Sequence, residues 1–336
     1  MIIVMKKGAK KSSIKHVISQ IEKAKLKPVP LYGTERTVIA IIGDERILHK
    51  DTLMAFPEVE KVMEVLKPYK LASKEGKKSS KVRVGDVVIG GKDIVIMAGP
   101  CAVENEKQIL NIAKSVKKSG AKILRGGAFK PRTGPYNFQG LREKGLKLLA
   151  KARKKTGLKI VTEVLDPRDV KLVSRYTDIL QIGTRNMQNY PLLREAGKTK
   201  MPVLLKRGMW ANYKELLLAA EYIMSQGNRE VILCERGVRT FENYTRNTLD
   251  ISAVPALKEQ THLPVIVDPS HGTGKKSLVA AMSKASIAAG ADGLIIETHN
   301  NPEKAVVDAD QTISTEEFSR LMKELSAIAK AVDRRL

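Results

Sequence analysis

Eight short apolar runs, rich in β-branched residues, follow one another after residue 93, and helical segments separate most of them. The runs span residues 94–101, 121–127, 159–164, 178–185, 202–208, 230–237, 264–271 and 293–299. Strands that alternate with helices pair in parallel, because a parallel neighbour requires a crossover connection. Eight such units close into a barrel, so the sequence predicts an α/β fold of the (β/α)8 TIM barrel type.

Polar and reactive side chains stand at the ends of these runs. In order along the chain they are Cys101, Arg125, Glu163, Arg185, Lys206, Arg236, His271 and Glu297. A TIM barrel carries its active site at the C-terminal ends of its strands. One barrel mouth would therefore collect a thiol, an imidazole, carboxylates and cations, which favours a metal site beside an anion site.

The metal hypothesis depends on four residues. Cys101, His271 and Glu297 stand at the ends of the first, seventh and eighth runs, which are neighbours in a closed barrel, and Asp308 follows the eighth. A mixed set of sulfur, nitrogen and oxygen ligands suits a divalent ion such as Zn, Mn, Fe or Co. The spacing alone also allows Cys101 to be a core residue and His271 a loop histidine. His299 shares the inward parity of Glu297 and is expected to support a ligand rather than to bind metal.

The anion hypothesis depends on a group of cations at or just beyond the second, fourth, fifth and sixth runs. They are Arg125, Lys130, Arg132, Arg185, Lys206 and Arg236. Each alone could be a solvated surface charge, but burying several together is costly unless an anion compensates them. Arginine suits bidentate recognition of phosphate or carboxylate. The group predicts a small substrate with two anionic groups.

The segment 130–140 is expected to be a rigid loop over the barrel mouth. Pro131 and Pro135 restrict the backbone of their neighbours. The loop would hold Lys130, Arg132 and Thr133 in place, so a second anion could bind to the Arg132 guanidinium and the Thr133 hydroxyl.

Residues 1–70 show a different pattern, which predicts a small separate domain. Strand, helix, two strands, a short helix and a final strand over 59–67 give the order βαββαβ of a ferredoxin-like unit. The polar segment 71–81 is predicted to be a flexible linker. A hairpin at the start of residues 82–336 would close the bottom of the catalytic barrel.

Composition excludes several classes of protein. The chain has 336 residues and a net charge of +24, but only 4% aromatic residues. The charge is spread along the chain and few aromatics are present to stack bases, so we expect no nucleic-acid partner. No apolar run reaches membrane-spanning length, and the first residues lack the order of a signal peptide. Two cysteines, Cys101 and Cys234, give no disulfide framework, which favours a cytoplasmic protein.

Seven motifs together resemble the 3-deoxy-D-arabino-heptulosonate 7-phosphate (DAHP) synthase family. They keep that family's order and span the barrel: AGPCAVEN (98–105), LRGGAFKPRTGPYNFQGL (124–141), QIGTRNMQN (181–189), LLKRGM (204–209), ILCERGVRTFE (232–242), DPSHGTG (268–274) and ETHNNPEKAVVD (297–308). Residues 1–70 resemble the ferredoxin-like regulatory domain that one branch of this family carries.

The resemblance implies a metal-dependent, aldol-like condensation of phosphoenolpyruvate with D-erythrose 4-phosphate, the first step of the shikimate pathway to aromatic amino acids. It implies one divalent metal ion (Mn, Fe, Co or Zn) and inhibition by Tyr or Phe through the N-terminal domain of a homotetramer. The family's roles carry over by motif as follows: metal ligands Cys101, His271, Glu297 and Asp308; phosphoenolpyruvate site Arg125, Lys130, Arg185, Lys206 and Arg236; erythrose phosphate site Arg132 and Thr133; proton donor Lys130; water or cation orientation Glu163.

Two other functions are weighed against this one. A 3-deoxy-octulosonate 8-phosphate synthase resembles the chain at GPC and several strand ends, but it has an Asn-containing segment in place of KPRTGP and no front domain. A binding module that has lost catalysis would need a missing ligand or a missing cation, and none is missing. Cys234 is interpreted as a packing residue, and Trp210 receives no role.

Overall fold

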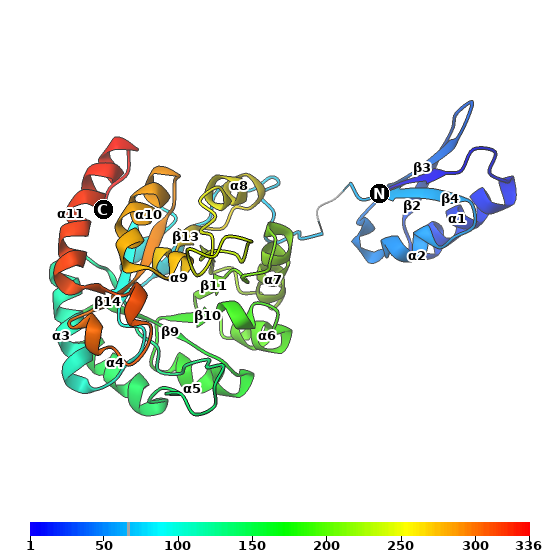
Figure 1. Cartoon of the computed structure of the whole chain (residues 1–336). Helices are drawn as coiled ribbons and strands as arrows, with labels where there is room; N and C mark the ends of the chain where they lie inside the picture. Colours follow the sequence, from blue (N-terminus) through cyan, green and yellow to red (C-terminus); the bar gives the residue numbers. More distant parts are fainter. Residues whose placement is uncertain (66–67) are drawn as a thin grey trace. The chain divides into compact units, whose positions relative to one another are not determined.

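The computed structural model describes residues 1–65 and 68–336, which form two compact units, Met1–Lys70 and Leu71–Leu336 (Figure 1). The last two residues of the strand predicted over 59–67 lie outside the described residues. Among the described segments, no helix combines the length and the apolar character that spanning a membrane requires.

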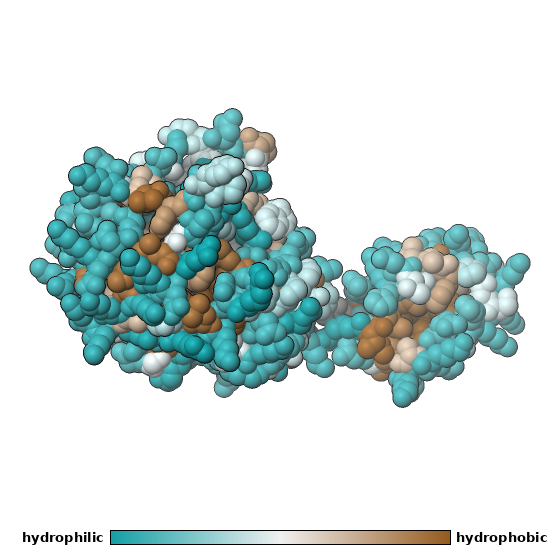
Figure 2. Space-filling model, turned by 90° about the horizontal axis from the view of Figure 1, so that it is seen from below, coloured by the Kyte–Doolittle hydropathy of each residue, from teal (hydrophilic) through white to brown (hydrophobic). Residues whose placement is uncertain are grey.

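The smaller unit has the predicted ferredoxin-like arrangement. Its elements are β1 (Ile2–Met5), α1 (Lys11–Lys23), β2 (Lys27–Tyr32), β3 (Thr37–Ile42), the 3-10 turn η1 (Glu45–Ile47), α2 (Lys50–Met54) and β4 (Val59–Met63). The four strands form an antiparallel sheet in the order β2-β3-β1-β4. The apolar stripe of α1, at Ile14, Val17 and Ile21, packs in one buried cluster with sheet residues such as Ile3 and Ile39. Figure 2 shows further apolar side chains gathered on the solvent-exposed surface of this unit.

The larger unit is the predicted eight-stranded parallel barrel. Its strands are β7 (Val95–Gly99), β8 (Ile123–Arg125), β9 (Lys159–Glu163), β10 (Ile179–Ile182), β11 (Val203–Lys206), β12 (Val231–Glu235), β13 (Val265–Val267) and β14 (Gly293–His299). They follow one another in chain order, and pairing of β13 with β14 and of β14 with β7 closes the ring. A short strand, β15 (Ile313–Ser314), pairs with the end of β14.

Helices cover the barrel strands on the outside. They are α3 (Glu106–Lys118), α4 (Glu143–Thr156), α5 (Val170–Ser174), α6 (Tyr190–Lys198), α7 (Tyr213–Ser225), α8 (Ala253–Gln260), α10 (Lys276–Ala288) and α11 (Thr315–Ala331). The short helix α9 (Pro269–Thr273) instead follows the C-terminal end of β13. Short 3-10 turns lie between elements: η2 (Pro167–Asp169), η3 (Thr184–Asn186), η4 (Pro302–Lys304) and η5 (Ala309–Gln311). Helix α7 starts at a capping box in which Asn212 and Glu215 each bond the other's backbone N–H, which fixes where this helix begins.

A hairpin closes the N-terminal end of the barrel, as the sequence suggests. Strands β5 (Val82–Val84) and β6 (Val87–Ile89) pair with each other, and their apolar side chains join a buried cluster with Met97, Ile232 and Cys234 from the barrel strands. This end is filled with side chains, and the open cavity of the barrel lies at the C-terminal ends of the strands.

The expectation of a flexible linker over 71–81 is wrong, because this segment is bound to the barrel. The backbone N–H groups of Leu71 and Ala72 donate to the Glu221 carboxylate at 2.8 and 2.9 Å. The Ser80 hydroxyl lies 2.6 Å from Nδ1 of His262, and the Ser80 N–H donates to the His262 carbonyl. Most side chains of the segment stay exposed, but several of its backbone N–H groups and the Ser80 hydroxyl are held by partners on the barrel.

The expected position of His271 at the end of a strand is also corrected. Strand β13 ends at Val267, and His271 lies in the short helix α9. Pro269 supplies no N–H for the sheet and suits the first turn of a helix. Asp268 accepts the N–H of His271 at 2.9 Å and so caps this helix.

Candidate metal centre and anion site

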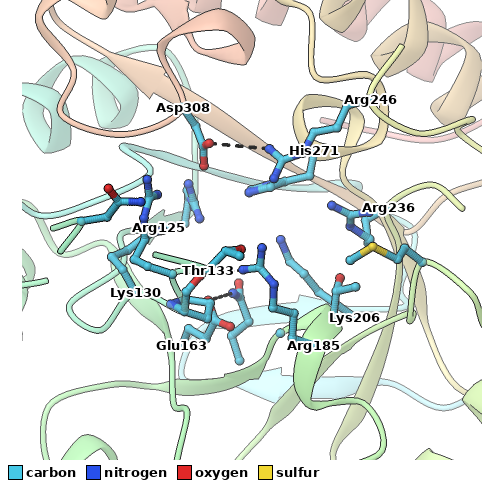
Figure 3. A pocket seen from close by; sticks show the side chains of 17 residues that line it. Arg125, Lys130, Thr133, Glu163, Arg185, Lys206, Arg236, Arg246, His271 and Asp308 are labelled. Carbon is cyan, nitrogen blue, oxygen red and sulfur yellow. Dashed lines mark hydrogen bonds and ion pairs between the residues drawn. The ribbon is translucent and has the colours of Figure 1, made fainter. Parts of the chain in front are cut away.

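A cavity of about 250 Å³ opens at the C-terminal end of the barrel strands (Figure 3). All the residues predicted as anion ligands line it, together with Glu163, His271 and Asp308. Seven of its lining side chains are Lys or Arg: Arg125, Lys130, Arg132, Arg185, Lys206, Arg236 and Arg246. Such an excess of cations in a concave site favours anionic ligands.

The four predicted metal ligands lie together at one side of this cavity. One ligand atom from each of Cys101, His271, Glu297 and Asp308 lies within 4.8 Å of the others. Sγ of Cys101 is 3.1 Å from Oδ2 of Asp308, and Nε2 of His271 is 3.3 Å from Oε1 of Glu297. A thiol, an imidazole and two carboxylates at this spacing fit a divalent transition metal or zinc.

Asp268 orients the imidazole of His271. Its Oδ2 lies 2.8 Å from Nδ1 of His271 and 2.5 Å from Nζ of Lys206. Burial alone would raise the pKa of Asp268, but the charges of His271 and Lys206 hold it well below its usual value. The ionised Asp268 accepts a hydrogen bond from Nδ1–H of His271, which leaves the Nε2 lone pair directed at the ligand cluster.

Both oxygens of the Glu297 carboxylate have partners. Oε1 accepts from Arg125 at 2.7 Å, and Oε2 accepts from Nε2 of Gln311 at 2.5 Å. Burial would raise the pKa of Glu297, but His271, Arg125 and Lys130 lower it to about 2. Glu297 is therefore ionised at neutral pH, as a metal ligand must be.

Lys130 lies against the Cys101 thiol. Its Nζ is 3.0 Å from Sγ and 3.2 Å from the Cys101 carbonyl oxygen. Burial, followed by the charge of Glu297, raises the pKa of the thiol above its usual range. Gly127 makes this approach possible, because a Cβ there would lie 2.8 Å from the Cys101 carbonyl oxygen and 2.9 Å from Cδ of Lys130.

The opposite side of the cavity consists of cations with few acidic partners. Arg236 is 4% exposed, and the one side-chain hydrogen bond found for it within the described residues goes to the Gly237 carbonyl at 3.4 Å. Burial lowers its pKa. Arg185 is exposed and donates to the Pro131 carbonyl at 2.6 Å, which ties it to the loop that carries Arg132. This side of the cavity is prepared for an anion.

Sequence reasoning missed three residues of the site. Arg246 lines the cavity, with NH1 3.6 Å from Oδ1 of Asp308 and 3.3 Å from Oε1 of Gln311 (Figure 3). Gln311 links Arg246 to Glu297, and Asp268 orients His271. Asp268 is the first residue of the predicted site motif DPSHGTG (268–274) and could have been found from its position. Arg246 lies in a long loop and Gln311 in the 3-10 turn η5, where no pattern singles them out.

Three residues that the sequence left without a binding role lie outside the ligand cluster. His299 accepts the Asn301 N–H at 2.9 Å, and its Nε2 lies 3.5 Å from Oε1 of Glu104. Neither of these partners is one of the four predicted metal ligands. Cys234 packs in the barrel core, as expected. Trp210 is 51% exposed.

Comparison with known families covers nearly the whole chain. Residues 69–332 match the DAHP synthetase I family, and residues 1–67 match the DAHP synthase ferredoxin-like domain. Phospho-2-dehydro-3-deoxyheptonate aldolase of Thermotoga maritima is 49% identical over 333 residues, covering 99% of this chain and 98% of that protein. A 2-dehydro-3-deoxyphosphooctonate aldolase of Syntrophotalea carbinolica is 32% identical over 267 residues, covering 74% of this chain and 95% of that protein.

Solved structures agree with these matches. The crystal structure of the Thermotoga maritima DAHP synthase superimposes with a TM-score of 0.94 at 48% identity, covering 99% of this chain and 98% of that one. A truncated form of 3-deoxy-D-arabino-heptulosonate 7-phosphate synthase from the same organism gives a TM-score of 0.75 at 46% identity, covering 80% of this chain and 98% of that one.

Proposed function

This chain belongs to the DAHP synthetase I family, and from that membership we propose that it condenses phosphoenolpyruvate with D-erythrose 4-phosphate and water. The products are 3-deoxy-D-arabino-heptulosonate 7-phosphate and phosphate. The observation that carries the proposal is a cluster of four metal-type ligands, of which His271 and Asp308 line the cavity, beside seven cations that line the same cavity. Two phosphorylated substrates, one of which also bears a carboxylate, supply the anions that such a cavity needs.

The cations divide between the two substrates. Phosphoenolpyruvate binds through the cations of the strand ends and the start of the loop: Arg125, Lys130, Arg185, Lys206 and Arg236. The phosphate of erythrose 4-phosphate binds to Arg132 and the exposed Thr133, further out on the same loop. With the two substrates bound in this way, their reacting carbons would meet beside the ligand cluster.

Cys101, His271, Glu297 and Asp308 would hold one divalent ion, either Mn, Fe, Co or Zn. When bound, the ion supplies Lewis-acid polarisation of the aldehyde. The ionised Glu297 and the fixed tautomer of His271 keep both residues ready to act as ligands. Arg125, at 2.7 Å from Glu297, keeps one carboxylate oxygen in place.

The chain's own residues carry the proton transfers. C3 of phosphoenolpyruvate forms a bond with the aldehyde carbon, and the aldehyde oxygen takes a proton from Nζ of Lys130, which lies 3.0 Å from Cys101 in the cluster. Water adds to C2, with Glu163 orienting it, and one of its protons restores Lys130. The tetrahedral intermediate then breaks the bond between C2 and the phosphate oxygen. Its C2 hydroxyl becomes the ketone, and the hydroxyl proton leaves with the phosphate. Glu163 lines the cavity beside Lys130 and Gln181.

Phosphate release from phosphoenolpyruvate tests the proposal. We expect release with erythrose 4-phosphate, loss of release after chelation with EDTA, and recovery on addition of a divalent metal. The 32% identity to a 2-dehydro-3-deoxyphosphooctonate aldolase makes arabinose 5-phosphate the competing acceptor. Release with arabinose 5-phosphate alone would move the chain to that function, and no release with either acceptor would refute both.

We further propose that Tyr or Phe inhibits the enzyme through the Met1–Lys70 unit, in a cytoplasmic homotetramer. A separate compact unit that matches the ferredoxin-like domain of the family supports the regulatory role. Two free cysteines support the cytoplasmic location. Removing residues 1–70 should leave turnover and abolish inhibition by Tyr and Phe. Full inhibition of the shortened protein would refute this role, and light scattering of the full chain tests the tetramer.

A further inference from the structure

A cluster of buried charges lies behind the anion side of the cavity and takes no part in the mechanism above. Arg207 follows Lys206 at the end of β11, and Glu235 precedes Arg236 at the end of β12. NH1 of Arg207 lies 2.8 Å from Oε2 of Glu235 and 2.8 Å from Oδ2 of Asp250. Arg207 and Glu235 are almost fully buried, with 6% and 0% of their surface exposed.

Strand alternation explains why Arg207 and Glu235 are buried behind the cavity while their chain neighbours, Lys206 and Arg236, line it. The pairing of β11 with β12 places Lys206 opposite Cys234, and the Arg207 N–H donates to the Cys234 carbonyl at 2.9 Å. Successive side chains of a strand point to opposite faces. Lys206 and Arg236 therefore point into the cavity, whereas Arg207 and Glu235 meet on the outer side of the same two strands.

Glu235 also fixes the backbone around Arg236. Its Oε1 accepts the Gly237 N–H at 2.5 Å, so the Glu235 carboxylate holds the peptide group between Arg236 and Gly237 in place. Gly237 has a φ of +86°, and a Cβ there would lie 2.8 Å from Cβ of Asn247. The turn that follows Arg236 is thus tightly specified. This matters because the Arg236 side chain has little else to hold it in the absence of an anion.

Asp250 connects the same cluster to the far end of the loop that starts at Arg236. Besides Arg207, its Oδ2 accepts the Tyr213 hydroxyl at 2.8 Å, and its Oδ1 accepts the Ala253 N–H at 3.1 Å. Paired N–H and carbonyl groups of Val238 and Thr248 join the two arms of the loop. Both ends of the loop are therefore attached to one arginine.

We propose that Arg207, Glu235 and Asp250 act as positioning residues for the phosphoenolpyruvate site, forming a brace that holds Arg236 in its anion-binding position. They touch no substrate and act through Arg236. This inference rests on the proposed function, since it names the residues that prepare the anion side of that same site. Buried ion pairs of this kind are costly to form, and fixing a unique geometry is a role that such pairs can have.

The test compares Glu235→Gln and Asp250→Asn with Asp292→Asn in the full-length protein. Asp292 is also buried and paired, with Lys258 at 2.9 Å and Arg334 at 3.3 Å, but it precedes β14 at the closed end of the barrel. We expect Glu235→Gln to raise the KM for phosphoenolpyruvate about tenfold, with kcat and the KM for erythrose 4-phosphate little changed. Asp250→Asn, which leaves the Arg207–Glu235 pair intact, should raise it about threefold. Asp292→Asn should lower Tm without moving either KM.

Calorimetric titration with phosphoenolpyruvate and with inorganic phosphate gives the same comparison without turnover. A wild-type protein that binds these anions but releases no phosphate from phosphoenolpyruvate would refute the proposed function. The anion affinities of the variants, compared with the wild type, would still test whether the brace positions Arg236. If Glu235→Gln does not fold, Asp250→Asn decides. Variants that fold and bind both anions as tightly as the wild type would overturn the proposal.

Discussion

The two sides of the cavity are built on opposite principles of charge balance. On the metal side each of the four ligands already has a partner: Glu297 meets Arg125, Cys101 meets Lys130, Asp308 meets Arg246, and His271 meets Asp268. On the anion side Arg236 is buried without a carboxylate contact among the described residues. The metal side is balanced by neighbouring side chains. On the anion side Lys206 is paired with Asp268, but the charge of Arg236 is balanced only when a substrate anion binds.

This difference separates the two functions of the cavity. Arg125 and Lys130 belong to both sides, because each contacts a predicted metal ligand and also lines the anion site. Lys206 contacts Asp268, which in turn holds His271. Changes to residues that belong to one side only should therefore alter one affinity and leave the other intact.

Cys101→Ala should give the largest effect and should affect the metal side alone. Loss of one of four ligands is expected to abolish measurable metal binding and to lower turnover by about a thousandfold or more, while the metal-free protein still binds phosphoenolpyruvate. Metal titration and calorimetry measure the two affinities. Cys234→Ala, the same change at the other buried cysteine, is the control and should keep both. Stoichiometric metal in Cys101→Ala would show that the ligand assignment is wrong.

Arg236→Ala should have the converse effect. Removing a charged hydrogen-bond donor from an anion costs about 1.5–3 kcal/mol, which corresponds to roughly a 10- to 100-fold weaker affinity for phosphoenolpyruvate. Metal affinity should stay within about twofold, because no hydrogen bond or ion pair among the described residues joins Arg236 to the four ligands. Arg168→Ala, at an exposed arginine outside the cavity, is the control. An equal loss of both affinities would contradict the division of the cavity into two sides.

The sequence predicts the residues of both sides better than it predicts how they are held. Short apolar runs that end in polar residues indicate the barrel and its mouth, because the C-terminal ends of parallel strands meet at one end of a barrel. The position of His271 in α9 was missed, although Asp268 at the cap and Pro269 in the first turn are local signals that a helix begins there. Arg246 and Gln311 were missed because long loops bring them to the site through tertiary contacts. The binding of 71–81 to the barrel depends on partners such as Glu221, about 150 residues away, which no local pattern reveals.

The pH dependence of metal affinity should sharpen the comparison further. Burial and Glu297 raise the pKa of the Cys101 thiol, so in the metal-free protein the thiol is protonated at neutral pH. Binding as a thiolate releases that proton, and affinity should rise about tenfold for each pH unit between pH 6 and 8. Metal titration in buffers of different ionisation enthalpy measures the protons released. A pH-independent affinity would show that the thiol does not bind as a thiolate.

Gln311→Ala should give the smallest effect and tests how the metal side is supported. The Gln311 amide donates to Oε2 of Glu297 and accepts from NH1 of Arg246, and Arg246 in turn faces Oδ1 of Asp308. Gln311 therefore holds Oε2 of Glu297 directly and Oδ1 of Asp308 through Arg246. Removing a partner of this type costs about tenfold in metal affinity, and the anion affinity should not change. Gln139→Ala is the matched control, because Gln139 is an exposed glutamine whose side-chain amide donates to backbone carbonyls of its own loop. If Gln311→Ala binds metal as tightly as the wild type, Arg125 and the protein backbone alone hold Glu297 in place.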